Sequence, residues 1–193
     1  FLFALFPSLF GEGYESIKSL SEYKAGDLFK DSLLVGFTEN KWMLLIFILL
    51  TLLLKAVAAG ITLGSGGNGG NFAPSLFVGA SLGFAFSFFL TEIGFTNIPV
   101  SNFTIVAMAG ILSGVFHAPL TGIFLIAEIT GGYELIIPLM IVSSISYVIV
   151  KYFHPHSSDV KRLKEKGAFV SDNKDSSLLS KIDTKAMIET DFT

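Results

Sequence analysis

The chain lacks cysteine altogether, which excludes disulfides, thiolate zinc sites and iron–sulfur clusters within its 193 residues. Charged residues are also scarce: they make up 15% of the chain, against about 25% in an average soluble domain. The formal net charge is only -3, which is too small to indicate a nucleic acid or an acidic partner. With 51% hydrophobic residues and a mean hydropathy of +0.67, the composition argues against a water-soluble enzyme. We expect no catalytic residue, no metal ion and no cofactor.

The few charges lie mainly at the two ends of the chain. Of the 13 basic and 16 acidic residues, only five fall between positions 41 and 150. These five are Lys41, Lys55, Glu92, Glu128 and Glu134. An apolar middle between two polar ends is typical of an integral membrane protein. Because the sequence starts inside an apolar run and not with Met, we expect the chain to be an internal fragment of a longer protein.

Long uncharged runs in the middle of the chain predict membrane helices, because a helix needs about 20 apolar residues to cross the hydrocarbon core. Residues 42–63 reach this length, with Lys55 as their only charge. Residues 103–127 also reach it, although His117 and Pro119 interrupt the run.

Two further runs, residues 75–90 and 135–150, are only 16 residues long and predict half or tilted helices. Transporters use such broken helices to expose helix ends to a substrate. Ordinary tilted helices, with their Gly and Pro residues satisfied by neighbours, remain the alternative. Residues 12–40 are polar and predict a loop or a short surface helix at a membrane face. The basic excess over residues 151–166 predicts a cytoplasmic tail.

A glycine-rich junction, GSGGNGGNFAP at residues 64–74, separates two of the apolar runs. Proline is favoured in the first turn of a helix, so a helix is predicted to begin near Pro74. Glycines before such a start let backbone N–H groups converge, and with the helix dipole they form an anion site without a charged side chain. Partial charges suit conduction, because the site must also release the ion. A close-packed glycine turn without a ligand remains the alternative.

Two sequence blocks, residues 64–83 (GSGGNGGNFAPSLFVGASLG) and 109–140 (AGILSGVFHAPLTGIFLIAEITGGYELIIPLM), carry a family resemblance. The chain resembles the second half of the membrane domain of CLC chloride channels and chloride/proton exchangers, over essentially residues 1–170. The resemblance implies an all-α integral membrane protein with the CLC inverted-repeat fold, built of broken and tilted helices, of which this chain holds the second repeat only.

The resemblance also implies how the chain is divided. Residues 1–153 would form the C-terminal half of the transmembrane domain, and residues 154–170 the final helix on the cytoplasmic side. Residues 171–193 would be a cytoplasmic linker that leads to CBS domains beyond this chain.

The function implied by the resemblance is passage of chloride, either through a voltage-gated channel or by antiport with protons. The implied assembly is a homodimer in the plasma (inner) membrane, in contact with lipid and with one anion pathway per protomer. The family's gating and proton-transferring glutamates lie in the half that this chain lacks, so the sequence leaves channel and exchanger both open. A structural or interaction subunit without transport is a further alternative.

The anion-binding residues implied by the resemblance are Gly70, Asn71, Phe72 and Ala73. In the family, backbone amides at the positions of Asn71 and Phe72 help to coordinate chloride. Most relatives have an aliphatic residue in place of Asn71, whose side chain would add a donor or cap the helix. Many relatives have a tyrosine at the central chloride site where this chain has Asp159. A carboxylate there would weaken the site, unless Asp159 is an ordinary first-turn residue of a cytoplasmic helix.

Two other features point to different chemistry. Residues 79–83 match the G-x-S-x-G pattern of serine hydrolases, with Ser81 as nucleophile and His117 as its base. That pattern needs a strand, a sharp turn and a helix, whereas these small residues favour close helix packing, so a membrane-embedded hydrolase is the least favoured alternative. Ionisable residues inside a membrane, here Glu128 and Glu134, are candidates for function. We expect a structural role, with Glu128 hydrogen-bonded to backbone near a helix end.

Overall fold

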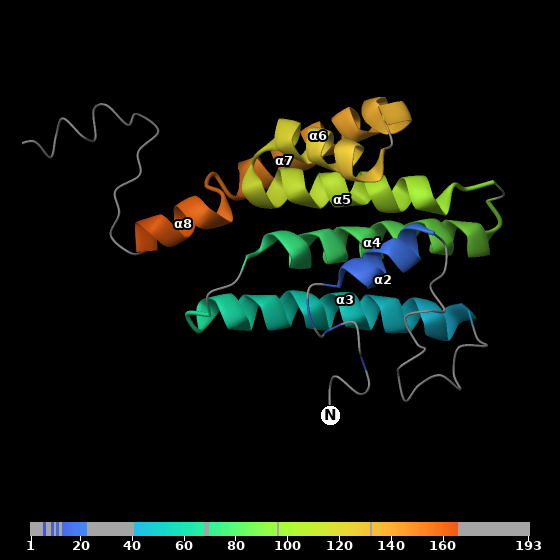
Figure 1. The fold of residues 1–193 in the computed structure, drawn as a ribbon, viewed down its shortest axis with the longest axis horizontal. Helices are drawn as coiled ribbons and strands as arrows, with labels where there is room; N and C mark the ends of the chain where they lie inside the picture. The colour runs from blue at the N-terminus through green and yellow to red at the C-terminus, as the bar shows by residue number, and fades with distance from the viewer. Residues whose placement is uncertain are drawn as a thin grey trace, which may run out of the picture. The chain divides into compact units, whose positions relative to one another are not determined.

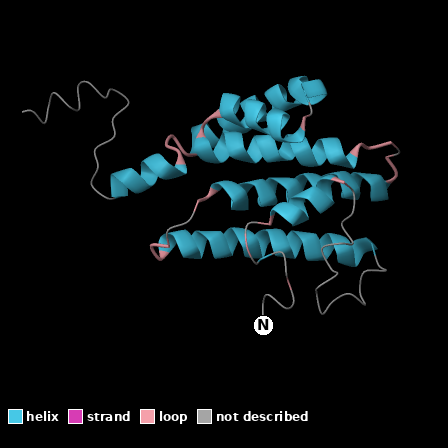
Figure 2. Ribbon diagram, viewed as in Figure 1, coloured by secondary structure: helices cyan, strands magenta, loops and turns pink. Residues whose placement is uncertain are grey.

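The computed structural model describes residues 6, 9, 11, 13–22, 41–67, 70–95, 97–131 and 133–165. Every regular element in these ranges is helical, as the all-α prediction requires (Figure 2). The elements are α2 (Tyr14–Ser21), α3 (Lys41–Gly64), α4 (Phe72–Ile93), α5 (Val100–Phe116), α6 (Pro119–Thr130), the 3-10 turn η4 (Tyr133–Leu135), α7 (Ile136–Phe153) and α8 (Ser158–Glu165). The chain divides into two units, Phe1–Pro155 and His156–Thr193, and α8 belongs to the second. The linker predicted at residues 171–193 lies outside the described residues.

Three segments are long and apolar enough to cross a membrane: α3, α4, and η4 together with α7. The first of these confirms the span predicted for residues 42–63. The prediction of half-length helices for the two shorter runs is wrong, because α4 has 22 residues and the segment Tyr133–Phe153 has 21. These helices continue past Glu92 and Lys151, since a long charged side chain near a helix end can reach the interface without ending the helix. An uncharged run therefore underestimates helix length.

The long run at residues 103–127 is divided between two helices. α5 has 17 residues, α6 has 12, and the break lies at His117 and Ala118. Pro119 is the first residue of α6, where its missing N–H costs nothing, and it disfavours helical geometry in the residue before it. His117 adopts the left-handed region, with φ 55°, which turns the chain between the helices. The interruption predicted at these residues is confirmed.

Helices of the first unit pack in layers. α5 lies between α4 on one side and α6 and α7 on the other, and α3 covers a further side of α4 (Figure 1). α4 and α5 approach closely because Gly79 and Gly83 face α5. A Cβ at Gly79 would lie 2.8 Å from the Cα of Met108, and one at Gly83 would overlap the carbonyl oxygen of Phe103. Small residues thus position α4, whose first turn carries the candidate site.

α2 falls within the polar stretch predicted as a loop or a short surface helix. It is a short helix, and it packs against α4 and α5 with Ile17 and Leu20 buried in the core. It is therefore part of the packed bundle and not only a surface element. Residues 23–40 of that stretch lie outside the described part of the chain.

Candidate functional site

The end of α3 positions the glycine-rich junction. The helix ends at Gly64, and Gly66 takes the left-handed conformation, with φ 87°. The N–H of Gly67 then donates to the carbonyl of Thr62 at 2.9 Å. This is the Schellman arrangement that closes many helices. A Cβ at Gly67 would lie 2.6 Å from that same carbonyl oxygen, so glycine is required at this position.

The start of α4 follows after the junction. Asn71 precedes the helix, and its carbonyl accepts the first intrahelical hydrogen bond, from Ser75 N–H at 3.1 Å. The helix begins at Phe72, so Pro74 is its third residue and the predicted start is two residues late. The proline is tolerated there because the N–H groups of the first turn have no intrahelical acceptor in any case. The glycine-rich junction thus indicates where α3 ends, but it does not give the first residue of α4.

The first turn of α4 presents backbone donors. The N–H groups of Phe72 and Ala73 precede the first intrahelical bond, and neither donates to another group in the described part of the chain. The side chain of Asn71 makes no capping bond, so the first of the two roles considered for it, a helix cap, is not observed, and its role as an added donor stays a prediction. Gly70 is exposed, and the three residues after it are half-buried. These donors lie at the positive end of the dipole of a 22-residue helix, a position that favours negative charge.

The ring of Phe72 fixes this turn against a neighbouring helix. Its centroid lies 6.5 Å from that of Phe116, with the two rings tilted by 45°. Phe116 is the last residue of α5, directly before the break at His117. Offset and tilted aromatic pairs of this kind contribute about 0.5–1.5 kcal/mol beyond their buried area. The start of α4 and the break between α5 and α6 therefore lie side by side.

A cavity of about 180 Å³ borders the same turn, with Gly70 and Pro74 in its wall. Lys55 and Thr62 of α3 also line it. Since a water molecule occupies about 30 Å³ of liquid, the cavity has room for an anion with several water molecules. Sequence reasoning noted Lys55 only as the single charge of an apolar run. An ionisable residue in such a run is by itself a signal of function, yet the predicted site residues do not include Lys55.

Asp159 lies in the first turn of α8, and its side chain is exposed. The carbonyl of Ser157, just before the helix, accepts the N–H of Lys161 at 3.0 Å. Asp159 thus has the first-turn position that the alternative interpretation gave it. Its place at a central chloride site stays a prediction.

Ser81 lies in the middle of α4, far from any helix end. Its side chain is 1% exposed, and the glycines on either side of it pack against α5. A nucleophile elbow needs a strand followed by a sharp turn, whereas Gly79 to Gly83 form a continuous helix. The hydrolase alternative for Ser81 is therefore wrong.

Two further sequence candidates have structural contacts. The carboxylate of Glu128 accepts a hydrogen bond from the hydroxyl of Tyr133, so its partner is a side chain and not the backbone that we expected. The ring of His117 meets that of Tyr147 edge to face, with 5.9 Å between centroids. Both residues are thus engaged in contacts between neighbouring elements. Glu134 is exposed.

Comparison with known proteins points to a single family. The sequence model of the family described as voltage gated chloride channel matches residues 1–151. A ClcB-like chloride channel protein of Ralstonia nicotianae is 35% identical over 144 residues, which are 74% of this chain and 29% of that protein. The H(+)/Cl(-) exchange transporter ClcA of Vibrio cholerae is 42% identical over 82 residues, covering 42% of this chain and 17% of the transporter. ClcA of Vibrio vulnificus is 40% identical over 85 residues, 43% of this chain and 18% of its own length. The chain thus spans less than a third of each relative.

Proposed function

This chain belongs to the voltage-gated chloride channel family, and we propose that the complete protein transports chloride across a membrane. The family consists of channels and exchange transporters and not of enzymes. Three segments of membrane-spanning length agree with a membrane location. Because this chain spans only part of its relatives, the transport activity is proposed for the full-length protein.

The observation that carries the proposal is a pair of backbone donors at the first turn of α4, the N–H groups of Phe72 and Ala73, that have no acceptor among the residues that the structure describes. The residues on either side of this segment, Gly70 and Pro74, line a cavity large enough for a hydrated anion. Amide dipoles hold an anion more loosely than a lysine or arginine would, and conduction requires that the ion leave again. We propose that Gly70, Asn71, Phe72 and Ala73 provide this chain's share of the chloride ligands.

The remaining ligands come, in this proposal, from the part of the protein outside this chain. Residues 1–153 are proposed to form the second of two inverted repeats, residues 154–170 the final helix, and residues 171–193 a linker toward CBS domains. The protein is proposed to be a homodimer in the inner membrane with a cytoplasmic tail. Asp159 is proposed to occupy the position of the family's central-site tyrosine, where it would weaken chloride binding.

Two modes of transport remain compatible with these residues: voltage-gated conduction, and exchange of chloride for protons. Chloride efflux from liposomes containing the full-length protein, with external pH recorded at the same time, separates them. Chloride flux with coupled proton movement would establish an exchanger, and chloride flux alone would establish a channel. If Asp159 faces the central site, we expect loose or absent proton coupling.

The amide of Phe72 can be tested without changing its side chain. Replacing Phe72 by the matching α-hydroxy acid turns its N–H into an ester oxygen, which removes one donor. A hydrogen bond to a charged group contributes about 1.5–3 kcal/mol, so we expect the chloride Kd to rise about tenfold or more. Calorimetric titration of the purified full-length protein with chloride measures this change.

The matched control is the same ester at Leu120, the second residue of α6. Its N–H also precedes the first intrahelical bond, which joins Gly122 N–H to the carbonyl of Ala118. The fold should therefore tolerate both esters equally, and only the one at Phe72 should weaken chloride binding. Equal chloride affinity in both variants would overturn the assignment of the site. A protein that folds but binds and passes no halide would instead be a structural subunit.

A further inference from the structure

Lys55 lies buried in the second half of α3, which has no other charged residue. Its side chain is only 4% exposed. The ammonium donates to the carbonyl oxygens of Leu9 and Gly11, at 3.1 and 2.7 Å. A buried cation is tolerated only when such groups replace its lost hydration. Lys55 therefore binds a part of the chain that lies 44 to 46 positions earlier in sequence.

The same ammonium also lies over an aromatic ring of α4. Its nitrogen is 5.5 Å from the centroid of Phe77, within the range of a cation–π contact. Phe77 in turn packs against Gly13, where an added Cβ would lie 3.0 Å from the ring. Gly13 has φ 82°, a conformation that favours glycine. Lys55 is thus the point at which α3 and α4 meet the described residues Leu9, Gly11 and Gly13.

The cavity runs from this point toward the start of α4. Ala58, Ala59 and Thr62 line it, at spacings of three, four and seven residues from Lys55, which places them on one face of α3. Their small side chains leave the space open between Lys55 and Gly70. The same cavity is therefore lined both by the lysine and by the residues that flank the predicted anion donors, Gly70 and Pro74.

Leu9 and Gly11 also line this cavity, and the carbonyl oxygens of both residues are held by the lysine. A carbonyl oxygen carries partial negative charge and repels an anion. We propose that Lys55 is a positioning residue of the anion site: its ammonium engages the carbonyl oxygens of Leu9 and Gly11 and fixes that segment as a wall of the cavity beside the first turn of α4. The inference rests on the proposed function of that turn.

The expected consequence of a substitution follows from the contacts of the ammonium with the carbonyl oxygens of Leu9 and Gly11. Lys55→Met keeps the length and apolar stem of the side chain but leaves both carbonyl oxygens without their donor. They can then face the cavity, and the segment is no longer tied to α3. Lys55→Arg retains a permanent cation with several donors, so it should restore part of the function. Lys41 at the start of α3 offers a matched control, because Lys41→Met makes the same change at a position exposed to solvent.

The experiment uses the full-length protein and compares the wild type with Lys55→Met, Lys55→Arg and Lys41→Met. Chloride is titrated calorimetrically, and chloride efflux is followed from liposomes. We expect Lys55→Met to raise the chloride Kd by about tenfold, Lys55→Arg by less, and Lys41→Met not at all. Wild-type affinity in Lys55→Met would overturn the inference. If the wild type itself neither binds nor passes chloride, the proposed function fails instead.

A second measurement does not depend on the folding of Lys55→Met. Thr62→Cys places a thiol in the cavity wall, and any cysteines in the rest of the full-length protein are first replaced by serine, since this chain itself has none. A negatively charged thiosulfonate reagent should modify this thiol, chloride should slow the modification, and the attached group should block efflux. The same thiol in the Lys55→Arg background should be modified at a different rate, because the wall has moved. Unchanged efflux after complete modification, or equal rates in both backgrounds, would overturn the inference.

Discussion

α3 and α4 are apolar helices of similar length that differ sharply in burial. In the most apolar window of each, 56% of the residues of α4 are buried but only 22% of those of α3, although α3 is the more apolar. Lipid chains are as apolar as leucine, so hydropathy alone does not drive a helix into the interior of a membrane protein. Close packing does. Strong hydropathy therefore marks the more exposed of the two helices in this chain, and small residues mark the more buried one.

The residues on the two helices follow this rule. The buried face of α4 includes the small residues Gly79, Ala80, Ser81, Gly83 and Ser87. The exposed face of α3 carries large side chains: Trp42, Met43, Ile46, Leu49, Leu50, Leu53, Val57 and Ile61. The helix that carries the candidate site is thus held by backbone approach, which allows little movement. α3 contributes to the site through Lys55 and the small residues that follow it.

The largest expected effect comes from placing a large side chain in the tightly packed face of α4. Gly83→Leu should prevent α4 from packing on α5, because even a Cβ would overlap the carbonyl oxygen of Phe103. Backbone atoms cannot move aside as side chains do, so we expect the free energy of unfolding to fall by about 3 kcal/mol or more. In practice the variant should yield little monodisperse protein in fluorescence-detected size-exclusion chromatography.

The control is Gly60→Leu in α3. A Cβ at Gly60 has nothing within 4 Å, so the same change should leave the yield and the melting temperature as they are or raise them slightly. If both variants behave alike, the contrast between the two helices is wrong.

Much of the fold could be predicted because its signals are local. The predicted span at residues 42–63 differs from α3 by one residue at each end, since a long uncharged run defines a span by length alone. The break before Pro119 followed from the chemistry of proline. α4 and α7 were underestimated because both helices extend past a charged residue near the end. Helix length depends on hydrogen bonding, which the charge pattern reports only indirectly.

The candidate site was predictable in part for the same reason. Its glycines and the helix start are adjacent in sequence, so the motif contains them. The two acceptors of Lys55 lie more than 40 positions away, and nothing in their own residues marks them as its partners. Leu9 and Gly11 act through backbone carbonyls, which every residue has. Contacts of this kind become visible only when the packing of α3 and α4 is known.

A substitution in the turn between α3 and α4 should destabilise the protein less than a substitution at Gly83 in the interface of α4 with α5. Gly66 has φ 87°, so Gly66→Ala forces a left-handed conformation on a residue with a Cβ, at a cost of about 1–2 kcal/mol. Gly64→Ala, two residues earlier and still within α3, should be neutral or slightly stabilising. Apparent melting temperatures at one scan rate compare the two. A melting temperature for Gly66→Ala at or above that of Gly64→Ala would show that this turn does not set the end of α3.

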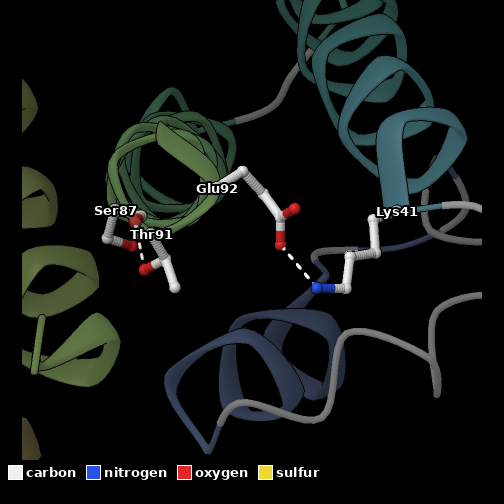
Figure 3. Close-up of polar contacts among 4 residues, drawn as sticks. All are labelled: Lys41, Ser87, Thr91 and Glu92. Carbon is white, nitrogen blue, oxygen red and sulfur yellow. Dashed lines mark hydrogen bonds and ion pairs between the residues drawn. The ribbon is translucent and has the colours of Figure 1, made fainter. Parts of the chain in front are cut away.

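The smallest effect is expected at the far ends of the two helices. Lys41 at the start of α3 donates to Glu92 near the end of α4 at 2.9 Å (Figure 3). The lysine side chain is 69% exposed and the glutamate 20%, and partly exposed ion pairs of this kind contribute at most about 1 kcal/mol.

A double-mutant cycle of Lys41→Met and Glu92→Gln, read from melting temperatures, isolates the contribution of this pair. We expect a small coupling at low salt that disappears in about 1 M salt, where the screening length is about 3 Å. A coupling that persists in high salt would mean that α3 and α4 are joined at this end by more than charge.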